Sequence, residues 1–419
     1  MSIPPLQSSA HPSLQRRATL SLGYDEAYNS NEGMKHLPLT TIQGYSWVFD
    51  QATKMTSGFW SRLALIGADV VLHMPYLGKE FVSTDTCWLF QEKWWPYLPA
   101  YHEFGHARAI RAFAPKKFKH YKVAANGSET YEEPSVIWYY IHCLKQLAHV
   151  DEAETHYNLC NLKNYTHNLL IYAGGLNNET LLAKEISERI YRFNGHIAYF
   201  GAYLRSKLGP VTYTAKTIAE VVPEDVGDVN YIVNYYKSYN PGFDLRYIQY
   251  GGWISLLCSS STYAFIKGYW YFVHTGNPIV TPMTWNGLRL PDINAYFTRN
   301  GLSLEVVTGY QITPNFWFNL GVETVYYPGT SMEFTPSLRY AILTQTYGAV
   351  EFEVGGVFNS YLHMSGHVGI EWTDPDKVLT LEAKLIHHNA NTYVGERNIP
   401  FAFDGDHYFE FMLAGAINY

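Results

Sequence analysis

The chain has 419 residues, of which 47% are hydrophobic and 16% charged, so it is long enough for two domains and too apolar to be a disordered protein. Its formal net charge is −7 and it contains no long run of Lys or Arg, which excludes the electrostatic footprint of a nucleic-acid-binding protein. The 36 Tyr, 22 Phe and 11 Trp residues are typical of a surface that meets lipid headgroups.

Residues 1–55 are interpreted as an N-terminal extension. The first residues are polar and contain Pro and Ser, without the charged-then-apolar layout of a secretory signal peptide. Export would therefore need a signal that this sequence does not display. Cys87, Cys143, Cys160 and Cys258 lie far apart and form no Cys-x-x-Cys pair, so they predict neither a metal cluster nor a redox dithiol; two disulfides remain open.

Residues 56–290 are predicted to form a mostly helical domain. Apolar residues come in stretches of helical length, for example over 59–77, 136–150 and 165–191. The run 247–266 has no charged residue over about the length that crosses a bilayer. Because Gly and Ser dilute this run, a buried core helix or loop is favoured over a spanning helix.

The period of the apolar residues switches to two after Pro291, which marks a domain boundary and a β domain over 291–419. Asn300-Gly301 is a favoured two-residue hairpin turn between the first two strands. The alternation predicts eight amphipathic strands, at 293–297, 302–310, 316–326, 332–342, 350–358, 362–372, 379–385 and 409–419. The expected fold class is thus α+β, with an antiparallel up-and-down barrel following the helical domain.

The eight strands resemble the small outer-membrane barrels of Gram-negative bacteria, including the terminal Tyr419 after an apolar alternating strand. The face opposite the apolar one mixes Gly and Ser with charges that suit a narrow polar lumen, namely Glu305, Glu323, Arg339, Glu351, Glu353, Glu371, Glu382 and Lys384. This pattern favours lipid outside the barrel and an outer-membrane location. A soluble barrel with its apolar face inward stays open, because alternation does not say which face looks out.

The segment His102-Glu103-Phe104-Gly105-His106 carries the candidate chemistry. It falls in a predicted helix over 101–114, which is punctuated by proline on both sides. His102 and His106, at i and i+4, share one face and can bind one metal ion, and Glu103 can reach water on that ion. The alternatives are a chance match or a pair of surface histidines, but the helix has little polar face apart from two arginines.

The stretch HEFGHARA resembles the zincin metallopeptidases. That resemblance implies a bound Zn²⁺ with His102 and His106 as ligands and Glu103 as the general base. A catalytic zinc also needs a third protein ligand and an open position for water.

Glu179 is the predicted third ligand. It follows Ala173-Gly174-Gly175-Leu176-Asn177-Asn178, and its distance from the motif resembles membrane-associated zincins with a glutamate ligand. The two glycines let their helix approach Gly105 closely. An ordinary helix-start carboxylate is the alternative for Glu179. Rival ligands in the sequence are His120, Asp151, His167 and Glu185.

These features together predict a zinc metalloendopeptidase that hydrolyses polypeptides and is held in the outer membrane by its own barrel. A non-catalytic membrane barrel with a structural or binding helical module is the second hypothesis. The third is a soluble metallopeptidase with a lipocalin-like barrel.

Overall fold

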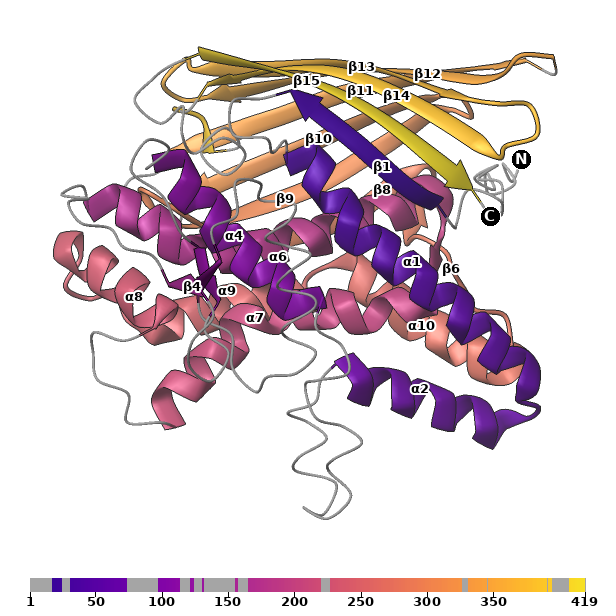
Figure 1. Ribbon diagram of the computed structural model, residues 1–419, viewed down its shortest axis with the longest axis horizontal. Coiled ribbons are helices and arrows are strands. Elements are labelled where there is room, and N and C mark those ends of the chain that lie inside the picture. The colour runs from indigo at the N-terminus through magenta and orange to yellow at the C-terminus, as the bar shows by residue number, and fades with distance from the viewer. Residues whose placement is uncertain are drawn as a thin grey trace.

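The computed structural model describes residues 17–24, 31–73, 97–113, 121–123, 130–131, 155–156, 165–219, 227–325, 331–344, 346–389, 391–393 and 407–418. A layer of helices lies beneath one large curved sheet (Figure 1). The α+β class and the order of a helical part before a strand-rich part are therefore confirmed. The stretch 136–150, predicted to be helical, lies outside the described residues, as do Cys87, Cys143 and Cys160.

The helices come mainly from the first two thirds of the chain. They are α1 (Asn31–Met55), α2 (Phe59–His73), α4 (Tyr97–Phe113), α6 (Tyr165–Phe193), α7 (Phe200–Ala219), α8 (Asp228–Tyr239), α9 (Leu245–Leu257) and α10 (Ser260–Thr275). A 3-10 turn, η4, covers Ile197–Tyr199. None of the helices in the described ranges is long and apolar enough to cross a membrane.

The large antiparallel sheet has ten strands. They are β1 (Arg17–Tyr24), β7 (Thr284–Trp285), β8 (Leu288–Thr298), β9 (Gly301–Thr313), β10 (Phe316–Val325), β11 (Met332–Thr344), β12 (Gly348–Asn359), β13 (Met364–Thr373), β14 (Leu379–Asn389) and β15 (His407–Asn418). Short strands form two small sheets, from β2 (Tyr121–Val123), β3 (Thr130–Tyr131) and β4 (Thr155–His156), and from β5 (Gly195–His196) and β6 (Ile279–Val280).

The eight predicted strands are β8 to β15, and each pairs with its neighbours in the chain. The N-terminal extension contributes to the same sheet, because β1 pairs with β15 over its whole length, from Arg17 opposite Asn418 to Tyr24 opposite Phe411. Helix α1 then packs against β1 and α6. The first 55 residues therefore contain two elements of the main fold, although β1 was not predicted from the sequence.

Among the residues that the structure describes, the sheet does not close on itself, which contradicts the predicted barrel. The strand order runs from β1 at one edge through β15 and β8 to β7 at the other. Helix side chains cover the edge of β8: Asn177 donates to the carbonyl oxygen of Phe297 at 2.9 Å and accepts from its N–H at 2.8 Å. Thr180 donates to the carbonyl oxygen of Ala295 at 3.1 Å. Because these groups already have partners, the sheet curls around helices instead of pairing with itself.

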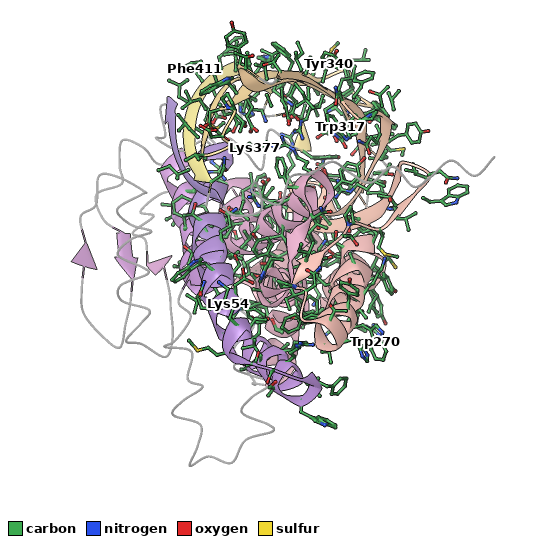
Figure 2. All side chains as sticks on the ribbon, turned by 90° about the vertical axis from the view of Figure 1, so that its right-hand side faces the viewer. Lys54, Trp270, Trp317, Tyr340, Lys377 and Phe411 are labelled. Atoms are coloured by element: carbon green, nitrogen blue, oxygen red, sulfur yellow. The ribbon has the colours of Figure 1, made fainter. Side chains whose placement is uncertain are left out.

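The apolar face of the sheet is the exposed one, and the charged face looks inward. Figure 2 shows Tyr340 and Phe411 on the outside of the sheet's arch. Many outward side chains keep between 40% and 63% of their surface exposed, among them Phe334, Leu338, Tyr340, Ile342, Phe352, Val354, Phe358, Met364, Val368, Ile370, Leu381, Leu385, Phe409, Phe411, Leu413 and Ile417. Glu305 and Glu323, paired across β9 and β10 on the opposite face, are buried. The orientation favoured in the sequence analysis, with the apolar face outward and the charged face inward, is therefore confirmed.

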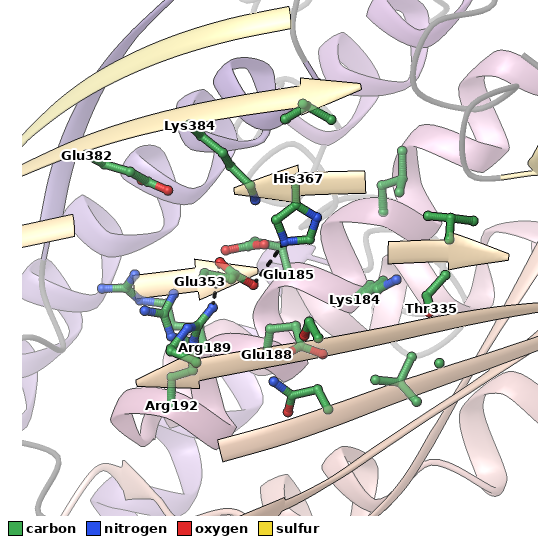
Figure 3. Close-up of a pocket in the computed structure, with 18 of the residues that line it drawn as sticks. Lys184, Glu185, Glu188, Arg189, Arg192, Thr335, Glu353, His367, Glu382 and Lys384 are labelled. Atoms are coloured by element: carbon green, nitrogen blue, oxygen red, sulfur yellow. Dashed lines mark ion pairs between the residues drawn. The ribbon is translucent and has the colours of Figure 1, made fainter. Parts of the chain in front are cut away.

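A polar cavity of about 290 Å³ lies between α6 and the inner face of the sheet (Figure 3). Its charges are paired across the two layers, with Arg192 of α6 3.0 Å from Glu351 of β12. Within the sheet, Glu353 lies 3.0 Å from Arg339 and 3.4 Å from His367. These pairs keep the interior polar without leaving large uncompensated charge.

Candidate metal centre

Helices α4 and α6 cross at a contact between glycine residues. A Cβ atom on Gly174 would lie 2.6 Å from the carbonyl oxygen of Gly105, and one on Gly105 would overlap the carbonyl oxygen of Gly174. A Cβ on Gly175 would lie 2.5 Å from Nε2 of His102. The close approach that the sequence predicted for these glycines is confirmed, and it holds α6 directly against the histidines of α4.

His102 and His106 lie on one face of α4 and are both buried. Their Nε2 atoms are 3.0 Å apart. The Nδ1–H of His106 donates to the carbonyl oxygen of Ile171 at 2.7 Å, and that of His102 donates to Oε1 of Glu179 at 3.0 Å. Both Nδ1 atoms thus have partners on α6, which leaves the two Nε2 atoms to face each other.

Asp228 completes the cluster. Its Oδ2 atom lies 3.2 Å from Nε2 of His102 and 3.1 Å from Nε2 of His106. It is the first residue of α8 and follows Gly227, whose positive φ of 96° favours glycine. The three residues offer donor atoms within 4.8 Å of one another, and they are the metal-compatible group found in the part of the chain that the structure describes. The sequence analysis did not single out Asp228.

Glu179 lies on the other side of His102. Its Oε1 contacts Nδ1, whereas Asp228 contacts Nε2 of the same ring. Its Oε2 is buried without a hydrogen-bond partner among the described residues and lies against Gly209 of α7. Of the rival ligands, His167 and Glu185 are on α6, with Glu185 lining the polar cavity, while His120 and Asp151 are outside the described residues.

Two further side chains lie at the cluster. The ring of Tyr213, from α7, stacks on His102 at an interplanar angle of 10°, and its hydroxyl lies 3.2 Å from Nε2 of His102. Burial raises the pKa of Tyr213 well above its usual value, and the negative charges of Glu179 and Asp228 add to the effect. Glu103 is buried beside His102, and its negative charge raises the pKa of both histidines.

The charged groups of the cluster shift one another's pKa values even without a metal. Burial by itself would lower the pKa of His102, but hydrogen bonds to Asp228 and Glu179 outweigh it and raise that pKa to about 10. Burial also opposes the charge of His106, and the negative charge of Asp228 raises its pKa. Burial would raise the pKa of Asp228, yet the two histidines hold it well below its ordinary range. Protons and a metal ion therefore compete for the same nitrogen atoms.

The donor set fits zinc. Two imidazole nitrogens and a carboxylate oxygen are ligands that Zn²⁺ takes in catalytic sites. Bonds of about 2.0–2.1 Å at tetrahedral angles place neighbouring donor atoms roughly 3.3 Å apart. The observed separations of 3.0, 3.1 and 3.2 Å are close to that spacing. The absence of a side chain on Gly175 leaves space beside both Nε2 atoms.

Comparisons of the whole chain with family models, with curated proteins and with solved structures find no match. The interpretation of the cluster therefore rests on the geometry of His102, His106, Asp228 and the residues around them.

Proposed function

We propose that the chain is a zinc-dependent metallopeptidase whose metal is held by His102, His106 and Asp228. The observation that carries the proposal is the convergence of two Nε2 atoms and one carboxylate oxygen within 3.2 Å, with both Nδ1 atoms tied to α6. This arrangement gives three protein ligands and leaves a fourth position for water or substrate.

The geometry favours Asp228 over Glu179 as the third ligand. A carboxylate that accepts the Nδ1–H of a metal-binding histidine fixes the orientation of the ring and makes its Nε2 a better ligand. Glu179 is placed for that supporting role on His102. Asp228 faces the Nε2 atoms of both histidines, which is where a ligand must lie.

A zinc ion held by His102, His106 and Asp228 would supply Lewis acidity for the substrate carbonyl and would lower the pKa of the attacking water. In the proposed mechanism, the carboxylate of Glu103 accepts a proton from that water and returns it to the leaving amine. The hydroxyl of Tyr213 donates a hydrogen bond to the oxyanion that forms on the carbonyl carbon. A purely structural zinc site would need no acid beside the first histidine.

The proposal includes attachment to a lipid bilayer, in the outer membrane, through the exposed face of the sheet. Strands β8 to β15 have 10 to 13 residues. A tilted strand of about 9–11 residues spans the hydrocarbon core. The apolar outward face and the charged inward face have the polarity expected of a sheet with lipid on its outer side. The substrate would then be a polypeptide near that membrane.

The experiment is peptide hydrolysis by the purified chain in detergent, measured with a library of quenched fluorogenic peptides. We expect activity that is lost on chelation and restored by zinc. Glu103→Gln should keep zinc and lose activity by about 10²–10⁴-fold. Unchanged activity in Glu103→Gln, at matched zinc content, would refute the peptidase proposal.

A non-catalytic metal centre in a membrane-attached protein is the second candidate. It is favoured by the dense hydrogen bonding of the cluster, in which Glu179 and Ile171 already hold both imidazole rings in place. Zinc binding that stabilises the chain, with no hydrolysis of any peptide in the library, would select this candidate.

A further inference from the structure

The outward side of the α9–α10 pair is as apolar as that of the sheet. Charged side chains are exposed at Arg246, in the first turn of α9, and at Lys267, in the middle of α10. Between them, every exposed residue is aromatic, aliphatic or cysteine: Tyr250, Trp253, Ile254, Leu257, Cys258, Tyr263 and Ile266. A helix pair that faced water would carry polar side chains on this side.

The buried side of the same pair is small and polar around the junction of the two helices, where it contains Gly251, Gly252, Ser255, Ser259, Ser261 and Thr262. Away from the junction it is apolar, with Ile248 in α9 and Ala264, Phe265, Phe272 and Val273 in α10. Lys207 of α7 reaches this side and donates to Oγ of Ser255 at 3.1 Å and to Oδ1 of Asn294 at 2.8 Å. Around the junction, the polar groups inside and the apolar groups outside are the reverse of the usual arrangement in water.

The polar side of the pair binds the edge of β8. Ser255 donates to the carbonyl oxygen of Ile293 at 2.9 Å, and the N–H of Ile293 donates to Oγ of Ser259 at 2.9 Å. Ser260 donates to the carbonyl oxygen of Leu290 at 2.8 Å. These bonds satisfy backbone groups that the next strand of a closed barrel would satisfy. The junction between α9 and α10 thus lies along the edge of β8 that a closing strand would pair with.

The outer surfaces of the sheet and the helix pair are connected. Leu302 of β9 fits against Gly251 of α9, so the helix packs directly on the strands. Trp270 is 70% exposed and Trp253 is 43% exposed. Tryptophan and tyrosine near the ends of an apolar surface are typical of the membrane interface.

We propose that the α9–α10 pair is a second lipid-facing wall, which lies in the bilayer beside β8 and takes the place of the strands that would close the sheet. This inference rests on the proposed attachment of the sheet to a membrane and extends it to the helices. A bilayer suits this surface better than a protein partner, because the outer side from Tyr250 to Ile266 has no exposed charge and continues the apolar face of the sheet. Arg246 and Lys267 have long side chains that would extend along the helices and bring their charges to the headgroups.

Cys258 provides a probe at the centre of this surface. It is exposed, forms no disulfide within the described residues, and lies at the junction of α9 and α10. In a variant with Cys87→Ser, Cys143→Ser and Cys160→Ser, Cys258 is the single cysteine. An environment-sensitive fluorophore attached to it reports whether this position is in contact with lipid or with water. The chain is reconstituted in liposomes of phosphatidylcholine and phosphatidylglycerol, with and without doxyl-labelled acyl chains.

Two matched single-cysteine variants, made with Cys258→Ser in the same background, separate the inference from the sheet proposal. Leu381→Cys places the probe on the outward face of β14, and Lys237→Cys places it on an exposed position of α8. We expect doxyl lipids to quench the probe by at least about twofold at Cys258 and at Leu381→Cys, and to leave Lys237→Cys unquenched.

Quenching at Leu381→Cys without quenching at Cys258 would overturn the inference and leave the sheet proposal standing. Quenching at neither position would refute both the proposed membrane attachment and this inference. The peptidase proposal would be unaffected, because hydrolysis of peptides is measured independently. If the cysteine substitutions prevent folding, tryptophan fluorescence of the otherwise unchanged chain replaces the probe. Brominated lipids should then quench it more than they quench a Trp253→Phe, Trp270→Phe variant, and equal quenching would overturn the inference.

Discussion

Oε1 of Glu179 lies 3.0 Å from Nδ1 of His102, on the opposite edge of the ring from the nitrogen that faces Asp228. A carboxylate in this position orients the histidine, whereas one at Nε2 can share its metal ion. The two acids are therefore expected to respond differently to substitution.

Asp228→Ala should reduce zinc affinity by more than about 100-fold, because it removes one of three protein ligands, while Glu179→Gln should reduce it by roughly 10–100-fold. The measurement is competitive titration of zinc against a chromogenic chelator. Near-normal affinity in Asp228→Ala, combined with complete loss in Glu179→Gln, would return the role of third ligand to Glu179.

Tyr213→Phe tests the proposed oxyanion donor. The hydroxyl lies 3.2 Å from Nε2 of His102, so its removal should lower kcat while the zinc content stays unchanged. Loss of one oxyanion donor costs about 10²–10³-fold in kcat. Tyr239→Phe is the matched control, since Tyr239 is 57% exposed at the end of α8. A change in KM alone would show that Tyr213 binds substrate without stabilising the transition state.

Gly105→Ala tests the crossing of α4 and α6. The new Cβ would overlap the carbonyl oxygen of Gly174, so the helices must separate at a cost of about 1–3 kcal/mol. Gly67→Ala in α2 is the control, because no described atom lies within 4 Å of its Cβ position. It should stabilise the protein by about 0.5–1 kcal/mol. The free energy of unfolding of each variant is measured with denaturant. Equal changes in the two variants would show that the contact between Gly105 and Gly174 does not contribute to stability.

The stability of the metal-free protein should depend on pH through the histidine cluster. The pKa of His102 is about 10 in the folded chain. Its unfolded value is about 6.5, so its stabilising effect is complete below that pH and is lost as the pH rises through the folded pKa. Asp228, whose pKa is lowered, stabilises the fold above about pH 4 and loses this effect as the pH falls through its folded pKa.

Metal-free protein should therefore be less stable at pH 9 than at pH 6, measured as the urea midpoint in detergent. Asp228→Asn should flatten this dependence, because it removes the negative charge that holds the histidines protonated. Greater stability at pH 9 than at pH 6 in the metal-free chain would contradict the assignment of the charges.

Local patterns in the sequence predicted the parts of the fold that depend on neighbouring residues. The alternation after Pro291 gave the strands β8 to β15 in order, and the spacing of His102 and His106 placed both on one face of α4. Strand β1 was missed although Ala18, Leu20 and Leu22 alternate with small polar residues, because one short strand is a weak signal.

The remaining features depend on contacts between distant parts of the chain. Asp228 is far from His106 in sequence and looks like any acidic residue at the start of a helix. The open sheet depends on side chains such as Asn177 and Ser259, which satisfy the edge of β8. An alternating pattern shows that a strand has two faces, but it does not show what covers its edge.

The most direct test of the proposed metal centre is the zinc content of the purified chain, folded in detergent and desalted without chelator, beside His106→Ala and Asp228→Ala. We predict about one zinc per chain in the unmutated protein and almost none in either variant. An unmutated chain that folds and binds no zinc would contradict the metal centre and, with it, the proposed peptidase.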